Sequence, residues 1–178
     1  AMPTAVECYH SRPDLSWIAQ EGLAILDTGA SRSVIGSDLW PGVLKSLPSE
    51  VRCQVKEVPS RVGFRFGNNQ ITYSFKQVRI PILSGKRRIW IVIEVVPRAT
   101  PFLISIQALK ALGAMIDLST NQCYLSKIQR WLNLRESENG LYVFKMSELC
   151  LGVTENAMSA KETAAIRVSN VLDRKSVV

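Results

Sequence analysis

The apolar residues of this sequence occur in short runs that turn-forming residues interrupt, and this pattern constrains the fold more than any other feature. The longest run rich in β-branched residues, 89–96, has the length of one strand and is broken by Glu94. A membrane-spanning helix needs about 18 consecutive apolar residues, which no segment approaches. Hydrophobic residues nevertheless make up 47% of the 178 positions, which is enough for a real core. We therefore expect an all-β globular domain with no membrane contact.

Two tight turns organise the middle of the chain into predicted hairpins. Residues 61–66 alternate between polar and apolar types, and Gly67-Asn68-Asn69 follows, a sequence that tolerates the positive φ of tight turns. Residues 70–83 should then return as one long strand. The second turn, Ser84-Gly85-Lys86, leads into a strand over residues 88–96. This region therefore predicts a succession of antiparallel strands.

Helices are expected at only one or two places. Residues 37–47 have helical character, with Pro41 placed in the first turn, where proline is tolerated. Ser105 is a candidate N-cap for a short helix over residues 106–112, and Gly113 would end it. The remaining short apolar pieces fall at residues 5–10, 17–20, 23–26, 33–35, 114–117 and 122–125, the last two forming a further hairpin.

The character of the sequence changes after residue 126. Residues 127–178 mix charged and small residues with weaker periodicity. Within this segment, residues 141–144 are a candidate strand and residues 157–168 a candidate helix. We therefore divide the chain into a domain over residues 1–126 and a C-terminal extension over residues 127–178.

The cysteines and the single histidine exclude several kinds of site. Cys8, Cys53, Cys123 and Cys150 are scattered without any Cys-x-x-Cys spacing, which argues against a zinc ribbon, a redox pair or a disulfide scaffold. Any catalytic triad with histidine, or any zinc site with histidine, would have to use His10. We expect a protein with no metal and no cofactor, with reduced thiols, located in the cytoplasm (intracellular or within a virus-like particle).

The positive charge is concentrated in the middle of the sequence. The formal net charge is +7, and residues 51–126 hold eleven basic and only three acidic side chains. Lys86-Arg87-Arg88, with Arg79 and Arg98, could contact RNA or an acidic partner. These residues alternate with apolar ones on predicted strands, however, so a solvated outer face is the better interpretation. Nucleic acid is not expected to be the main ligand.

The most informative segment for chemistry is Asp27-Thr28-Gly29, which follows the apolar residues 23–26. A carboxylate at the end of a buried strand is unfavourable unless it has partners or a function. Glycine lets the backbone turn tightly, and a threonine hydroxyl can hydrogen-bond to neighbouring backbone groups. Taken alone the pattern is weak evidence, since Asp-Ser/Thr-Gly should occur by chance in roughly one in ten chains of this length.

The ordered context makes the pattern more specific. Asp27-Thr28-Gly29-Ala30-Ser31 resembles the active-site motif of the retropepsin-like aspartic proteases of retroviruses and retrotransposons. Residues 64–71 match the position of the family's flap hairpin, and residues 108–114 resemble its short helix and Leu-Gly-Ala ending. The resemblance covers about residues 5–126. It implies a small closed β-barrel protomer with one or two short helices.

Three positions depart from the family pattern. Ser105 stands where many members have a glycine before the short helix, and Ile106 stands where an arginine often follows. Ser31 replaces the aspartate that is usual in retroviral members two residues after the motif glycine. The resemblance therefore predicts the turn and the helix, but not the ion pair that retroviral members form here.

The resemblance implies roles for the residues that match. Asp27 would be the catalytic carboxylate, Thr28 and Gly29 would organise it, and Ala30 and Ser31 would line the cleft. The flap tip would be formed by Phe66, Gly67, Asn68, Asn69 and Gln70. The implied activity is an aspartic endopeptidase that processes the polyprotein in which it is made, with a peptide or polyprotein as substrate.

The motif occurs once, which has a consequence for assembly. Asp117-Leu118-Ser119 lacks the glycine and is better interpreted as a turn-capping aspartate. Two carboxylates are needed to share a proton, so the second must come from another copy in a two-fold homodimer. Two rival interpretations stay open: a non-catalytic, dimerising domain derived from a retroelement, and a basic nucleic-acid-binding module.

Overall fold

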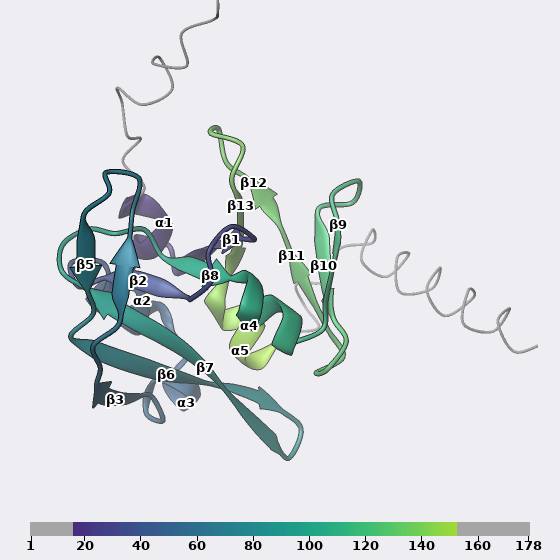
Figure 1. Ribbon diagram of the computed structural model, residues 1–178. Helices are drawn as coiled ribbons and strands as arrows, with labels where there is room; N and C mark the ends of the chain where they lie inside the picture. The colour runs from purple at the N-terminus through teal and green to yellow at the C-terminus, as the bar shows by residue number, and fades with distance from the viewer. Residues whose placement is uncertain (1–15, 153–178) are drawn as a thin grey trace, which may run out of the picture.

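The computed structural model describes residues 16–152, which form a mostly β fold with short helices (Figure 1). The helices are α1 (Ser16–Gln20), α2 (Trp40–Ser46), α3 (Ser49–Arg52), α4 (Ile106–Ala111) and α5 (Met146–Leu151). The strands are β1 (Leu23–Asp27), β2 (Val34–Gly36), β3 (Lys56–Pro59), β4 (Gly63–Arg65), β5 (Ile71–Tyr73), β6 (Lys76–Ser84), β7 (Arg87–Val96), β8 (Leu103–Ser105), β9 (Ala114–Asp117), β10 (Gln122–Leu125), β11 (Arg130–Asn133), β12 (Arg135–Glu136) and β13 (Tyr142–Lys145).

Eight of these strands form one mixed sheet in the order β12-β13-β1-β8-β2-β7-β6-β3. β1 pairs with β13 antiparallel and with β8 parallel, so both of its edges are occupied. β8 lies between β1 and β2, and β2 continues the sheet by pairing parallel with β7. Separate sheets contain β11-β10-β9 and β4-β5. The end of β1 is therefore held in the middle of the largest sheet.

The buried core explains why these elements come together. β6 and β7 each place alternate apolar side chains on one face, among them Val78, Ile80 and Ile93, all fully buried. Helices α2, α4 and α5 contribute Val43, Leu109 and Leu149 to the same cluster. Burial of apolar side chains stabilises a fold by about 25 cal/mol per Å² of surface removed from water. Strand alternation in the sequence thus corresponds to one shared core.

Several local predictions are confirmed. The chain turns at Gly85, which has a φ of +58°, and at Asn69, which has a φ of +58°. Pro41 lies in the first turn of α2. The Ser105 side chain accepts a hydrogen bond from the Ala108 backbone N–H at 3.2 Å and caps α4, and Gly113 follows α4 with a φ of +65°. β9 and β10 form the expected hairpin.

Other predictions differ from the structure. Five short helices occur within residues 16–152, rather than one or two, and residues 17–20 lie in helix α1. The main sheet has β12 and β3 at its two ends, with no pairing between them in this part of the chain, so the closed barrel stays a prediction. No helix among the described residues is long and apolar enough to cross a membrane. Cys8, His10, the strand expected at residues 5–10 and the helix expected at residues 157–168 lie outside the described residues.

The long strand predicted over residues 70–83 is two strands, because the chain changes partner at Ser74. The buried Ser74 hydroxyl accepts a hydrogen bond from the Val62 N–H at 2.8 Å, and the Ser74 N–H donates to the Val62 carbonyl at 2.8 Å. At the next residue, the Phe75 N–H donates to the Val95 carbonyl at 3.1 Å. β5 therefore belongs to the hairpin with β4, whereas β6 belongs to the main sheet.

The expected C-terminal extension contributes to the sheets as far as it is described. β11 pairs with β10 across residue 126, and β13 pairs with β1 through Ala24–Phe144 and neighbouring pairs. The strand predicted at residues 141–144 is confirmed as β13, and Phe144 is fully buried. Residues up to 152 are thus structurally continuous with the domain assigned to residues 1–126.

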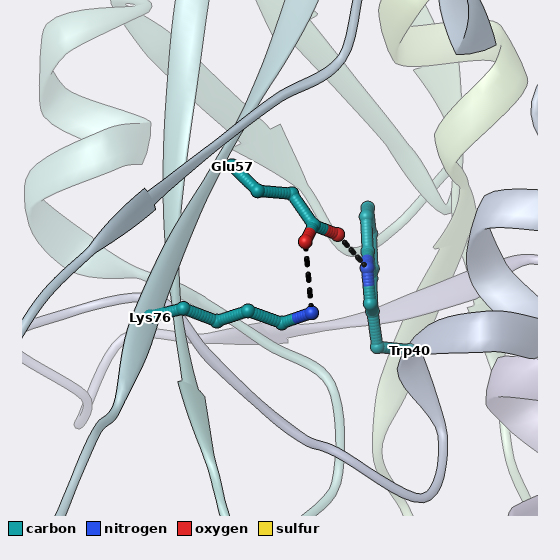
Figure 2. A network of polar contacts seen from close by, with 3 residues as sticks. All are labelled: Trp40, Glu57 and Lys76. Atoms are coloured by element: carbon teal, nitrogen blue, oxygen red, sulfur yellow. Dashed lines mark hydrogen bonds and ion pairs between the residues drawn. The ribbon is translucent and has the colours of Figure 1, made fainter.

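A polar network fixes the opposite end of the main sheet. The indole N–H of the buried Trp40 donates to Glu57 Oε1 at 3.0 Å, and Lys76 Nζ lies 2.9 Å from Glu57 Oε2 (Figure 2). The hydrogen bond from Lys76, followed by that from Trp40, lowers the pKa of the Glu57 carboxyl. This contact connects α2 to the edge strand β3 and to β6.

Candidate active site at the end of strand β1

The Asp27 side chain lies at the carboxyl end of β1, where the strand leaves the core. Ala24 and Ile25 are buried, Asp27 is half-buried, and Thr28 and Gly29 are exposed. The Gly29 N–H donates to Asp27 Oδ1 at 2.8 Å, and the Ala30 N–H donates to the Asp27 carbonyl at 3.3 Å. The sequence Asp-Thr-Gly therefore forms a tight turn that holds one carboxylate oxygen.

Glycine at position 29 has a steric reason. A Cβ atom at Gly29 would lie 3.2 Å from Asp27 Oδ1, closer than most real Cβ contacts. A side chain here would press on the oxygen that the Gly29 N–H binds. Among the described residues, no group makes a hydrogen bond with the other carboxylate oxygen of Asp27 or with the Thr28 hydroxyl. These groups are therefore available to an external partner.

Strand β8 supports the turn from beside it. Asp27 is in register with Ser105 in the parallel pair of β1 and β8. Ser33 Oγ accepts a hydrogen bond from the Ser105 N–H at 3.0 Å and donates to Ser105 Oγ at 3.2 Å, and both serines are buried. The Ile106 N–H also donates to the Ala30 carbonyl at 3.0 Å. The turn after β1 is thereby tied to the start of α4 at both of its ends.

The predicted flap residues lie in the β4–β5 hairpin, which is separate from the main sheet that carries the Asp27 turn. Phe66, Gly67, Asn68, Asn69 and Gln70 form the tip between β4 and β5, and all except the half-buried Phe66 are exposed. The tip is ordered by its own contacts, since the Asn69 N–H donates to the Phe66 carbonyl and the Gln70 N–H to Asn68 Oδ1. Phe64 and Phe66 stack with ring centroids 6.1 Å apart. In the described residues, no hydrogen bond or ion pair joins this tip to the Asp27 turn.

Sequence reasoning missed a cavity of about 390 Å³ next to the Asp27 turn. Its polar wall is formed by Ser31, Arg32, Ser33, Glu94, Ser105 and Gln107, and its apolar wall by Ile82, Ile89, Trp90, Ile91, Val92, Ala108, Ala111 and Leu112. Glu94 is only 2% exposed. The signal in the sequence was this acidic residue within the apolar run 89–96, since a buried carboxylate in a strand needs a partner or a role.

No metal site is evident in residues 16–152, where no three histidine, cysteine, aspartate or glutamate side chains gather. The buried cysteines are unsuited to nucleophilic chemistry. Burial raises the pKa of the Cys123 thiol to about 11 and that of Cys150 to about 12, so both are protonated at neutral pH. Asp27, half-buried at the end of β1, is the candidate catalytic group that the sequence predicts.

Comparison with known proteins finds similarity in structure but not in sequence. No family model matches the chain, and no curated protein matches it in sequence. The fold is similar to the crystal structure of the retroviral protease-like domain of Ddi1 from Leishmania major, with 15% sequence identity and a TM-score of 0.35. The match covers 76% of this chain and 94% of that one.

Proposed function

We propose that the protein is a retropepsin-like aspartic endopeptidase. The observation that carries this proposal is the Asp27 turn: a half-buried carboxylate at the end of a buried central strand, with one oxygen bound by the Gly29 N–H at 2.8 Å. A turn that served only to connect strands would not require a carboxylate in this partly buried position. The family motif at the same residues supports the proposal.

The mechanism follows from a pair of carboxylates. Two such groups within hydrogen-bond distance cannot both stay ionised, so they share one proton. The ionised member accepts a proton from a bound water, and the protonated member donates to the carbonyl oxygen of the scissile peptide. The water oxygen then attacks the carbonyl carbon, and no covalent enzyme intermediate forms. The chemistry needs neither a metal nor an organic cofactor.

The second carboxylate would come from Asp27 of another copy of the chain. Two surface features favour such an assembly. Thr28 and Gly29 are exposed beside Asp27, as a site shared across a two-fold axis requires. β9 is an edge strand whose neighbourhood exposes Met115, Ile116 and Leu118 by 58%, 38% and 56%. Exposed apolar edge strands are typical of surfaces that pair with another chain.

The β4–β5 hairpin would act as the flap. Its tip is exposed and is bounded by the change of strand partner at Ser74, so the hairpin can move without breaking the main sheet. Closure over a peptide would exclude water and complete the site. Ala30 and Ser31, at the other side, would line the cleft. Closure of the sheet into a barrel, and processing of a polyprotein, are parts of the same proposal and rest on the resemblance.

The experiment is an incubation of the purified protein with a peptide library, with and without pepstatin. We expect cleavage that pepstatin inhibits, with a maximum at acidic to weakly acidic pH, because the carboxylate pair must be half-protonated. Specific activity should fall on dilution, and sedimentation should show a monomer–dimer equilibrium over the same concentrations. A strictly monomeric species with full activity would contradict the shared site.

The two rivals predict other results. A non-catalytic dimerising domain would give the same equilibrium by sedimentation but no cleavage of any peptide. A nucleic-acid-binding module would bind polyanions with an affinity that falls steeply as salt is raised. Neither rival explains the held carboxylate at Asp27.

A further inference from the structure

Within residues 16–152, the cavity beside the Asp27 turn lies along a stretch of strand β7 that has no strand partner on its β2 side. β2 pairs only with Glu94–Val96 of β7, and the remaining part of β7 continues past the end of β2 as a hairpin with β6 (Figure 1). Helix α4 faces this stretch and supplies Gln107, Ala108 and Ala111 to the opposite wall. The cavity is therefore a groove between a free strand edge and a helix.

The hydrogen-bond pattern shows which backbone groups of β7 face the groove. The Glu94 N–H donates to the Ser33 carbonyl and the Ser37 N–H donates to the Val96 carbonyl, so these residues direct their backbone groups toward β2. Backbone direction alternates along a strand in an antiparallel pair. Val92 and Trp90 must then direct their N–H and C=O groups to the same side as Glu94, beyond the end of β2. Pro81, which is opposite Trp90, agrees with this register because it has no N–H to donate.

Glu94 lines the groove and has an unsatisfied carboxylate oxygen. Gln77 Nε2 donates to Glu94 Oε1 at 3.0 Å, and Arg79 Nε donates to Gln77 Oε1 at 3.0 Å, which fixes the orientation of the amide between them. Glu94 Oε2 is buried and has no hydrogen-bond partner in the part of the chain that the structure describes. A buried carboxylate oxygen without a donor destabilises the fold, because it has lost its hydrogen bonds to water and gained none in return. A donor supplied from outside would remove this penalty.

From these features we infer that the groove is a docking site for an extended segment of the polypeptide substrate that carries an arginine or lysine side chain. The segment pairs with the free groups of Trp90 and Val92 as an added strand. Its cationic group donates to Glu94 Oε2, and its aliphatic part contacts the apolar wall. A volume of about 390 Å³ lies in the range of pockets that bind small groups. Assignment of the segment to the substrate rests on the proposed protease function, whereas the binding itself does not.

Arg32 is the one cation on the wall of this groove, and it is exposed. Within residues 16–152 it forms no ion pair with Glu94. A swing of Arg32 into the groove would satisfy Glu94 from within the chain. The experiment below therefore includes Arg32, so that this internal occupant can be told apart from a peptide.

The first arm measures binding of fluorescein-labelled peptides to the full chain carrying Asp27→Asn, which prevents cleavage. One peptide has a single arginine among threonine and valine residues, and the other has citrulline, which keeps the shape without the charge. We expect the arginine peptide to bind at least tenfold more tightly, because the donor to a buried carboxylate is charged. The protein has a net charge of +7, so non-specific electrostatics would act in the opposite direction. Equal affinities would overturn the inference.

The second arm tests pairing with the strand edge. Only alternate amides of an added strand face β7, so the arginine peptide is N-methylated at one of two adjacent residues. One of the two methylated peptides should lose at least tenfold in affinity, and the other should bind as the parent peptide does. Equal behaviour of the two peptides would mean that no strand pairing occurs.

The third arm changes the protein. Glu94→Gln should lower the affinity for the arginine peptide at least tenfold and leave that for the citrulline peptide unchanged. Glu136→Gln on β12, at the other end of the main sheet, is the matched control and should change neither. If Glu94→Gln does not fold, the comparison of the arginine and citrulline peptides in the first arm still tests whether the groove binds a cationic side chain. If Arg32→Ala raises the affinity for the arginine peptide tenfold, and Arg32 and Glu94 are coupled in thermal stability, Arg32 is the natural occupant and the inference fails.

Failure of the docking site and failure of the protease proposal are distinguishable. Arginine-dependent binding without cleavage of any peptide by the unsubstituted protein would leave the site in place and remove its assignment to the substrate. Pepstatin-sensitive cleavage with equal rates and equal binding for arginine and citrulline peptides would support the protease proposal and rule out the docking site.

Discussion

Two aspartates in this molecule end a strand and form the same local turn, and they differ in nearly everything else. Asp27 Oδ1 accepts the N–H of Gly29 at 2.8 Å, and Asp117 Oδ1 accepts the N–H of Ser119 at 2.9 Å. In each case the carboxylate binds the backbone two residues ahead, as Asx-turns do. Local geometry therefore does not distinguish the two aspartates.

The surroundings of Asp27 and Asp117 distinguish the two aspartates. β1 has a neighbour on each side, and Asp27 is half-buried beside the buried Ser33–Ser105 network. Asp117 ends the edge strand β9, is exposed, and accepts a second hydrogen bond from the Ser119 hydroxyl at 2.5 Å. One turn is thus held in a site where a reacting group could be placed, and the other only stabilises a hairpin. The two carboxylates are therefore distinguished by their position in the sheets and not by their local turns.

The difference between Asp27 and Asp117 is tested most directly by neutralising each of the two carboxylates separately. Asp27→Asn removes the titrating carboxylate and keeps the size of the side chain, so peptide cleavage should fall by about 10²–10⁴-fold. Asp117→Asn should change the cleavage rate by less than about twofold. Both variants should give circular dichroism spectra like that of the unsubstituted protein. Retention of more than about 1% of activity by Asp27→Asn would remove Asp27 from the mechanism.

The strand that carries the Asp117 turn should matter for assembly rather than chemistry. Met115→Lys places a charge on the exposed edge β9, and charged edge strands resist pairing with another chain. The protein concentration that gives half-maximal specific activity should rise by about tenfold, equivalent to about 1.4 kcal/mol. Leu151→Lys on α5, also an exposed apolar position, is the control and should leave the dilution curve unchanged. A similar shift for both variants would locate the interface elsewhere.

Ser105, beside the Asp27 turn, and Ser119, in the Asp117 turn, should contribute differently to the free energy of unfolding. Ser105→Ala removes the cap of α4 and the hydroxyl that accepts a hydrogen bond from the buried Ser33, so the free energy of unfolding should fall by about 1–2 kcal/mol. Ser119→Ala changes an exposed hairpin and should stay within about 0.5 kcal/mol. Urea denaturation of the two variants measures both values. A larger loss for Ser119→Ala than for Ser105→Ala would reverse the assignment of the buried network.

The smallest effect concerns the titration of Asp117. The hydrogen bond from the Ser119 side chain, followed by that from Thr120, lowers the pKa of the Asp117 carboxyl from its ordinary value of 3.8. A lowered pKa in the folded state means that the carboxylate contributes stability at neutral pH and loses it as the pH falls below about 4. Ser119→Ala should return this pKa toward 3.8, as measured by NMR titration of the carboxyl carbon. An unchanged titration curve would mean that Ser119 is not the main cause.

The features that depend only on neighbouring residues could be predicted from the sequence. Gly67-Asn68-Asn69 and Gly85 predict turns because few residues adopt positive φ, and Ser105 predicts a helix start because its side chain reaches an N–H three residues ahead. The Asp27-Thr28-Gly29 turn belongs to the same group, since its hydrogen bond spans two residues. These predictions succeed because their energetics are local.

Which strands pair with one another could not be predicted from local sequence and is seen only in the folded chain. Residues 70–83 have one continuous strand pattern, and their division at Ser74 follows from two competing partners: the segment around β4, which is close in sequence, and β7, which follows about twenty residues later. In the same way β13, from the segment assigned to an extension, occupies the edge of β1 and buries Phe144. Many strands share the same alternation, so the choice among partners depends on packing rather than on pattern.

The groove beside Asp27 also combines a feature that the sequence predicts with one that depends on tertiary contacts. Glu94 was visible in the sequence as a charge inside an apolar run, but its unsatisfied oxygen depends on Gln77 across the hairpin and on where β2 ends. The turn that holds Asp27 was predictable for the opposite reason, because its geometry is contained within three residues. Contacts between distant segments are set by the common core, which no local pattern of residues specifies.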